Sequence, residues 1–241
     1  MSLSTAGGLS LATSLSPRAV ATRARLIAAA ERLFAELGIA GVSLNEINRA
    51  ARQRHSNACQ YHFGGKDGLI QAILDKHIPG IAARRNAMFD EMELAGTLGL
   101  DHVVKAFVRP IADKLFDPDG GKEFIRIDAQ LIAQATVALR GSGGAPFTFH
   151  AADRLNRRLD AAMAAQGLPP AIARQRLVMA AIMLFHGLAD YSRLLDTMGE
   201  TGEAPDPELF IRDLEAMMLG ALTAPVAEAT LARLRQAEHD R

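Results

Sequence analysis

One short stretch of the sequence concentrates side chains suited to binding nucleic acid. It contains Arg49, Arg52, Arg54, His55, Ser56, Asn57, Gln60, His62 and Lys66. Aspartate and glutamate are absent from Ile47 through Lys66. Arginine, asparagine, glutamine and serine side chains read base edges or hold phosphates. On charge alone, a solvated basic face of an ordinary helical domain explains this stretch equally well.

The elements expected around these residues favour DNA. Ser43-Leu44-Asn45-Glu46 has the pattern of a capping box, which begins a short helix. A polar turn and a second short helix, from about Ser56 to Tyr61, complete a helix-turn-helix whose second helix can enter a major groove. Gly64-Gly65 then breaks the chain, and a longer helix begins at Lys66. The free amides at its start can hold a phosphate.

The rest of the chain is also expected to be helical. Ser16-Pro17 and Gly38 have the pattern of a helix start and end. Good helix formers dominate, and alternating strand patterns are nearly absent. Glycine and proline punctuation beyond residue 95 predicts helices over 99–116, 122–140, 146–166, 170–199, 206–222 and 224–237.

Residues 19–76 resemble the DNA-binding domain of the TetR/AcrR family of bacterial transcriptional regulators. The most specific part is the ending of the second short helix, Tyr61-His62-Phe63, with the segment that follows it, Gly64-Gly65-Lys66-Asp67-Gly68-Leu69. The resemblance implies an all-α fold, in which a linking helix joins an N-terminal three-helix helix-turn-helix domain to a C-terminal ligand-binding and dimerisation bundle. The implied divisions are an arm over 1–17, a DNA-binding domain over 18–64, a linking helix over 65–94 and a regulatory domain over 95–241.

The resemblance also assigns roles within the first domain. Arg54, His55, Ser56, Asn57 and Gln60 would lie at or near the side of the recognition helix that faces the groove. Backbone phosphates or a base edge would be bound by Tyr61 and His62, and further phosphates by Lys66, Thr22 and Ser43. Cys59 is expected to be a small buried residue rather than a redox switch.

One departure from the family pattern concerns the turn. The usual turn reads Ala-Gly-Val-Ser, whereas this chain reads Ala51-Arg52-Gln53-Arg54-His55-Ser56, one residue longer and without glycine. A branch of the family with a Gln-Tyr-His-Phe ending has a similar insertion. The register of Arg54, His55 and Ser56 on DNA therefore stays open.

Two apolar helices near the C-terminus suggest a homodimer. Residues 172–195 are apolar nearly all round, and 207–222 carry an apolar stripe. By resemblance, such a pair meets its two-fold mate, which suits a palindromic operator on double-stranded DNA. The expected interface residues are Leu184, Leu188, Phe210, Leu214, Met217 and Met218.

A pocket for a small apolar or amphipathic effector is also implied. Its candidate lining residues are His102, Phe107, Phe124, Phe147, His150, Met179, Met183, His186 and Tyr191. For most of these, core packing is the favoured interpretation, because apolar periodicity does not distinguish a core from a pocket. His186 in particular is expected to be a hydrogen-bonded core histidine.

The sequence therefore predicts a DNA-binding regulator, in the first instance a repressor released by an effector. A helical protein-interaction module and a transcriptional activator are the alternatives. No enzyme activity, metal or cofactor is expected, because the seven histidines and one cysteine form no ligand pattern. The single cysteine favours a cytoplasmic location, because it cannot support a disulfide framework. The longest uncharged apolar stretch, Leu177 to Ala189, has 13 residues, whereas a membrane span needs about 20, so no membrane partner is expected.

The net charge of zero is the sum of two regions with opposite net charges. Residues 18–80 contain nine Lys or Arg and five Asp or Glu, a balance of +4, and residues 81–241 contain 18 and 22, a balance of −4. A basic DNA-binding region and an acidic regulatory region are averaged in the total. Long-range attraction to DNA is therefore expected to be modest, so specific contacts must supply much of the affinity.

Overall fold

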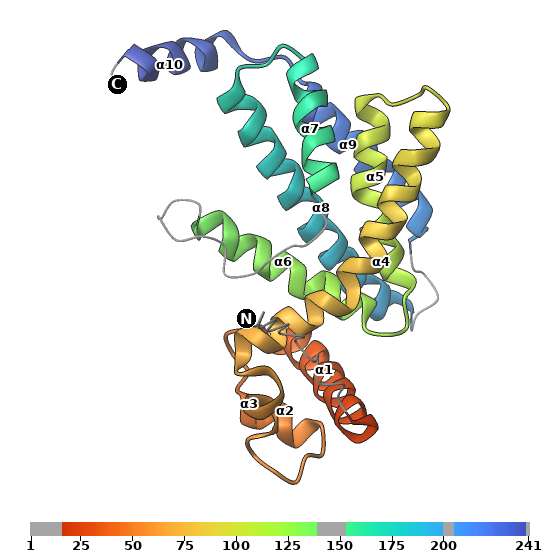
Figure 1. Cartoon of the computed structure of the whole chain (residues 1–241). Helices are drawn as coiled ribbons and strands as arrows, with labels where there is room; N and C mark the ends of the chain where they lie inside the picture. The colour runs from red at the N-terminus through yellow and green to blue at the C-terminus, as the bar shows by residue number, and fades with distance from the viewer. Residues whose placement is uncertain (1–15, 139–152, 200–204, 240–241) are drawn as a thin grey trace, which may run out of the picture.

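The structure is a computed structural model that describes residues 16–138, 153–199 and 205–239. Within these ranges the chain forms ten α-helices, one 3-10 helix and no strand (Figure 1). The expected all-α fold, with an N-terminal helix-turn-helix and a C-terminal helical domain, is confirmed. The elements are α1 (Pro17–Leu37), α2 (Leu44–Ala50), α3 (Ala58–Phe63), α4 (Lys66–Leu94), α5 (Leu100–Ala112), η1 (Asp113–Phe116), α6 (Gly121–Ala138), α7 (Asp153–Ala165), α8 (Pro170–Gly199), α9 (Pro207–Thr223) and α10 (Glu228–His239).

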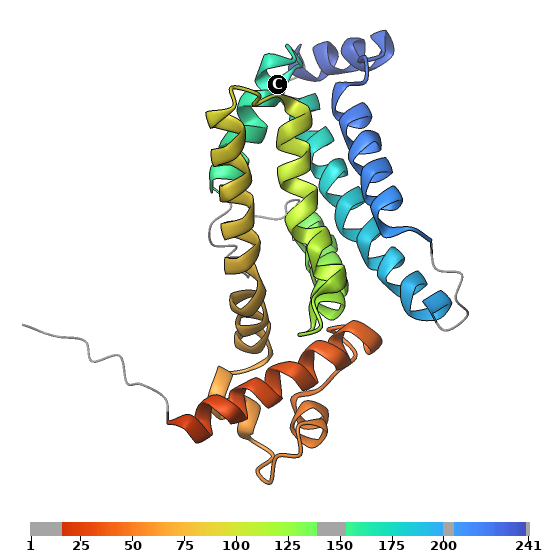
Figure 2. The same ribbon diagram turned by 90° about the vertical axis from the view of Figure 1, so that its right-hand side faces the viewer.

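Helices α1 to α3 form a head at one end of the molecule, and α4 runs from this head into the body formed by the later helices (Figure 2). Local sequence sets their ends. The Ser16 hydroxyl accepts a hydrogen bond from the amide of Ala19, and Pro17 occupies the first turn of α1. Ser43 and Glu46 form the complete capping box of α2. Gly64 ends α3 in the left-handed conformation, with φ 73°.

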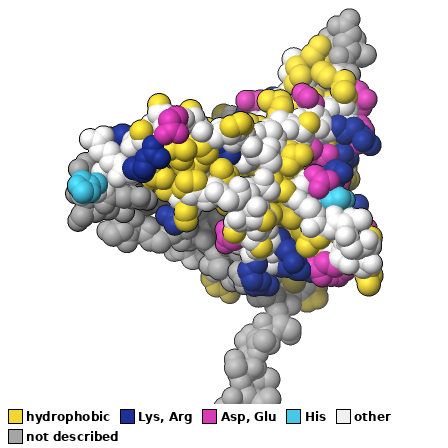
Figure 3. Space-filling view, turned by 90° about the horizontal axis from the view of Figure 1, so that it is seen from above, with side chains coloured by type: hydrophobic (Ala, Val, Ile, Leu, Met, Phe, Trp, Pro, Cys, Tyr) yellow, Lys and Arg dark blue, Asp and Glu magenta, His cyan; other side chains and the backbone are white. Residues whose placement is uncertain are grey.

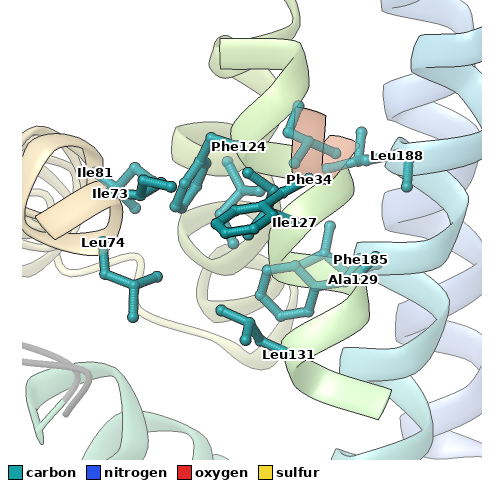
Figure 4. Packing of buried hydrophobic residues seen from close by; sticks show 14 of the residues in the cluster. Phe34, Ile73, Leu74, Ile81, Phe124, Ile127, Ala129, Leu131, Phe185 and Leu188 are labelled. Carbon is teal, nitrogen blue, oxygen red and sulfur yellow. The ribbon is translucent and has the colours of Figure 1, made fainter. Parts of the chain in front are cut away.

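Helix α6 lies between the head and the rest of the body (Figure 1). It packs extensively against α8 on one side and against α1 on the other. Phe124 and Ile127 of α6 are fully buried, together with Phe34 of α1 and Leu188 of α8. Figure 4 shows these side chains in one continuous cluster with residues of α4. Head and body therefore share a hydrophobic core rather than folding around two separate ones.

Several expected boundaries shift in the structure. The helix expected over 99–116 divides into α5 and η1. Helix α4 continues through Pro79 to Leu94. The last helix begins at Glu228 rather than at residue 224. Residues 146–152 of the helix expected over 146–166, and most of the expected arm over 1–17, lie outside the described residues. The expected domain divisions remain predictions.

Apolar surface remains at the end of the body away from the head. Seen from that end, hydrophobic side chains gather on the projecting arm that holds α10, among scattered charges (Figure 3). By length and composition, one described helix is able to cross a membrane, at Pro170–Met198, and the bent pair α9 and α10 passes the same test together. A helix packed inside a helical bundle meets this test equally well. The expected absence of a membrane partner stays a prediction.

Candidate DNA-binding site and effector cavity

A buried amide fixes the recognition helix α3 against α2. Asn48 is 3% exposed; its Nδ2 donates to the carbonyl of Ser56, and its Oδ1 accepts from the backbone amide of Cys59 at 3.0 Å. Both ends of one side chain thus hold the start of α3. The polar motif in the sequence did not identify Asn48, because its function is to position α3 and its side chain faces inward.

The lengthened turn uses a left-handed residue where the family pattern has glycine. Arg52 has φ 52°, and in the described part of the chain it is the one non-glycine residue with positive φ. Gln53 stabilises the turn by donating from Nε2 to the Ala51 carbonyl at 2.9 Å. Arg54, His55 and Ser56 follow as exposed residues before α3 begins. They therefore lie in the loop that leads into the recognition helix.

A groove of about 550 Å³ separates the start of α1 from the exposed side of α3. Tyr61 stands at its edge with 85% of its surface exposed. An exposed aromatic residue with a polar tip is available for a phosphate or a base. The groove brings together five of the predicted DNA-binding residues, Thr22, His55, Asn57, Tyr61 and His62, with Ser16, Arg18 and Gln53 beside them.

Arg23 ties the end of α3 to α1. Its guanidinium lies 4.3 Å from the centre of the Phe63 ring, and it donates to the carbonyl of His62. Partial burial, followed by the charge of Arg23, lowers the pKa of His62. The imidazole of His62 is therefore more often neutral at physiological pH than a free histidine. A neutral ring can still donate a hydrogen bond to a phosphate oxygen.

Three other predicted DNA-binding residues also have roles inside the protein. Lys66 donates from Nζ to the carbonyl of Ile39 at 2.9 Å, and this bond joins the start of α4 to the turn that follows α1. Gln60 donates from Nε2 to the carbonyl of Gly64 at 3.0 Å. The Ser43 hydroxyl is engaged with Glu46 in the capping box. A DNA contact by any of the three would add to these bonds or replace them.

Cys59 is fully buried, as expected. Burial raises the pKa of its thiol to about 11. The thiol therefore stays protonated at physiological pH, and a protonated thiol is a poor nucleophile. Its position in the core of the head favours the packing role over a redox role.

The body contains a largely apolar cavity of about 280 Å³. Phe107 and Phe124 line it, as the effector prediction required, and Phe185 joins them. Two charged residues that the prediction missed, Arg85 and Asp128, also line it. Asp128 lies one helical turn from Phe124, so both residues are on the same face of α6, and a cavity lined by Phe124 also predicts Asp128 in its wall. The carboxyl of Asp128 and the guanidinium of Arg85 form the charged part of the cavity.

Most other predicted effector residues lie elsewhere. Met179 and His186 are exposed, so the expected core role of His186 is wrong. Tyr191 is buried and donates its hydroxyl to the carbonyl of Pro205 at 2.7 Å. His102 has its Nδ1 2.9 Å from Oδ1 of the neighbouring Asp101. The half-buried Met183 does not line the cavity, whereas Phe147 and His150 lie outside the described residues.

Four predicted dimer-interface residues are buried by packing within the chain. Their side chains lie where α8 packs against α6 and α9, so they are not available for contact with a second copy of the chain. Phe210 is half-buried and stacks on Tyr191, with ring centres 4.0 Å apart, while Met217 is 54% exposed. The four buried residues are Leu184, Leu188, Leu214 and Met218.

Gln130 connects the cavity wall to the head. Its Nε2 donates to the carbonyl of Phe34 at 3.0 Å, and its Oε1 accepts from the amide of Ile39 at 2.8 Å. The amide thus binds two backbone groups at the end of α1, the Phe34 carbonyl, which also accepts from the Gly38 amide, and the Ile39 amide in the turn that follows. Asp128 and Ile132, which line the cavity, flank Gln130 on the same helix. One helix therefore contacts both the head and the cavity.

Three solved structures are similar to this chain. One, described as the molecular basis for control of antibiotic production by bacterial hormones, has 21% identity and TM-score 0.45, covering 84% of this chain and 97% of its own. A TetR transcriptional regulator from Streptomyces coelicolor has 19% identity and TM-score 0.39, covering 90% and 96%. A TetR-family transcriptional regulator from Pectobacterium atrosepticum has 21% identity and TM-score 0.36, covering 88% and 100%.

The comparison of sequences is more specific. A search of curated proteins gave no match. Residues 26–73 match the family model described as bacterial regulatory proteins, tetR family. The matched segment contains most of α1, all of α2 and α3 and the beginning of α4, which are the elements that form and support the helix-turn-helix. Over residues 26–73 this chain is therefore similar to the bacterial regulatory proteins of the tetR family.

Proposed function

We propose that the protein is a homodimeric repressor that leaves a palindromic operator when a small molecule enters the body cavity. The observation that carries the proposal is the double role of α6, which lines the cavity through Asp128 and holds the end of α1 through Gln130. A cytoplasmic location and the absence of enzyme activity belong to the same proposal.

The exposed surface of α8 and α9 supports the dimer. Only 22% of the most apolar window of α8 is buried within the chain. Met179 and Leu194 on α8 are exposed, as are Leu209 and Met217 on α9. Exposed apolar side chains on two adjacent helices favour association. A two-fold pairing would also present two recognition helices, and operator half-sites about 34–36 Å apart suit such a pair.

The link between cavity and head supports release by a ligand. A repressor needs its two recognition helices at one separation, and an effector that prefers another separation lowers DNA affinity by its difference in binding free energy, typically about 1–3 kcal/mol. Since α6 packs on α1 and lines the cavity, a ligand that shifts α6 also shifts the head.

Tyr61→Ala tests the DNA-binding surface. With 85% of its surface exposed, Tyr61 contributes little to folding, so the variant should keep its melting temperature and lose about tenfold or more in operator affinity. Lys66 is a poorer choice, because its loss also breaks the bond to Ile39. Arg235→Ala on α10, far from the head, is the matched control. Operator fragments come from selection of bound DNA, and unchanged affinity of Tyr61→Ala would contradict the proposed surface.

Sedimentation tests the dimer. Leu209→Asp places a charge on an exposed apolar side chain of α9 and should yield monomers at micromolar concentration. Arg233→Asp on α10 provides a control charge change outside the proposed interface. A monomeric mass for the unmodified protein would refute the homodimer.

A further inference from the structure

The effector cavity contains two buried charged groups that do not pair directly with each other. Asp128 is 4% exposed and Arg85 is 7% exposed, and both line the cavity. Each acts on the charge state of the other, yet no ion pair joins them in the described part of the chain. A separated buried pair is an unusual arrangement, because burial of a charge is costly unless it is paired and hydrogen-bonded.

The polar atoms of this pair are incompletely satisfied. Oδ1 of Asp128 is the one buried side-chain atom without a hydrogen-bond partner among the described residues. Arg85 donates from Nε to the carbonyl of Ala106 at 3.0 Å, and no other hydrogen bond of its guanidinium is found in that part of the chain. A buried polar atom without a partner destabilises the fold, and a ligand group that bonds to it would remove this cost.

The aromatic side chains that line the cavity, together with its volume, restrict the size and polarity of the rest of the ligand. Phe107 and Phe185 meet edge to face with ring centres 6.4 Å apart, and Phe124 adds a third ring. In Figure 4, Phe124 points toward the side chains of α4 and Phe185 projects from α8. A volume of about 280 Å³ lies just below the usual range for ligand pockets, about 300–1,000 Å³. The wall therefore suits a small, compact apolar body with aromatic character.

We infer that the effector is a small aryl or alkyl compound with an uncharged hydroxyl-type head that donates to Asp128 and accepts from Arg85. This inference rests on the proposed effector function of the same cavity. A hydroxyl group has one donor and two acceptor lone pairs, so it bridges a carboxylate and a guanidinium. An ether lacks the donor, and a carboxylate head places a second negative charge beside Asp128.

Direct binding tests this chemistry without DNA. The probes are 4-phenyl-1-butanol, its methyl ether and 4-phenylbutanoate, titrated calorimetrically at concentrations up to about 1 mM. The titrations are done at about pH 8, where Asp128, with a pKa of about 7, is mostly ionised. The full-length protein should bind the alcohol about tenfold or more tightly than the ether, in line with the loss caused by an unpaired buried polar group. Equal or tighter binding of the ether or the carboxylate would overturn the inference, as would absence of binding by all three probes.

Asp128→Leu provides the decisive comparison. This substitution removes the acceptor and keeps the branched arrangement of heavy atoms, so the preference for alcohol over ether should disappear. Asp160→Asn on α7, which is exposed and does not line the cavity, should keep the preference. If Asp128→Leu fails to fold, Asp128→Asn, which retains one acceptor oxygen, should show a reduced preference. An unchanged preference in the variant measured would overturn the inference.

Operator release is measured separately. If the alcohol binds through Asp128 and leaves DNA affinity unchanged, the effector chemistry stands and the proposed release mechanism fails. If an apolar compound without a hydroxyl head releases the operator and the alcohol does not bind, the release mechanism stands and the effector chemistry fails.

Discussion

The Nε2 atom of His77 on α4 lies 2.8 Å from Oε1 of Glu31 on α1, and these side chains are 1% and 3% exposed. Lys76 adds an ion pair to the same carboxylate at 2.9 Å. On its other side, the His77 ring packs against Phe124, with ring centres 4.6 Å apart, and Phe124 lines the cavity. Contiguous side chains therefore lead from the cavity wall to the first helix of the head.

Glu31→Gln should weaken this junction. The amide keeps the shape of the side chain and leaves Lys76 without its buried partner, so the free energy of unfolding should fall by about 1–3 kcal/mol. Operator affinity should fall with it, because α1 loses its anchor to α4. Urea denaturation and a DNA titration measure the two effects. Asp119→Asn is the control: Asp119 pairs with the same lysine but its side chain is 80% exposed, so the change should be small.

Gly68→Ala should displace the recognition helix. A Cβ atom at position 68 would lie 1.8 Å from the carbonyl oxygen of Phe63, which is backbone and cannot rotate away. The start of α4 must then move from the end of α3, at an expected cost of about 1–3 kcal/mol in stability and a loss of operator affinity. Gly80→Ala on the same helix has no neighbour within 4 Å and should stabilise by up to about 1 kcal/mol. Equal melting temperatures for the two variants would contradict this packing.

Arg52→Gly should stabilise the turn before the recognition helix. Arginine at φ 52° bears a steric cost of about 1–2 kcal/mol that glycine avoids, although glycine gains entropy in the unfolded chain. The net expectation is a gain of up to about 1 kcal/mol, measured by urea denaturation. Arg54→Gly, in the same loop without positive φ, should gain nothing. Destabilisation by Arg52→Gly would indicate that the Arg52 side chain itself holds the turn.

Asp128 should make stability depend on pH. Burial raises its pKa from 3.8 to about 7, and the charge of Arg85 offsets this only in part. Between about pH 4 and 7 the folded chain holds a proton that the unfolded chain has released, so the free energy of unfolding falls as the pH rises through this window. The decline is at most about 4 kcal/mol, at roughly 1.4 kcal/mol per pKa unit.

Asp128→Asn should flatten that decline, because the amide does not titrate. The variant should therefore gain stability relative to the unmodified protein at pH 8, with a smaller difference at pH 5. Urea denaturation at both pH values measures the effect. Asp160→Asn controls for loss of a surface carboxylate. A difference that does not change with pH would indicate that Asp128 is ionised throughout.

Local sequence patterns are sufficient to predict the helical class and the DNA-binding head. Capping at Ser16 and Ser43 and the break at Gly64 depend on neighbours in the chain, so local chemistry is sufficient to predict them. The tetR-family match over residues 26–73 falls on this same locally encoded region.

Local patterns do not predict which apolar side chains face a core, a cavity or solvent, because this depends on how distant helices pack. Leu188 and Met179 lie on one apolar helix, yet the first is fully buried and the second is 55% exposed. Nothing in their residue types separates them, because burial depends on which distant helix packs on each face. Asp128 and Arg85 likewise become a buried pair only when α4 and α6 meet, since contacts between distant segments are not written in local spacing.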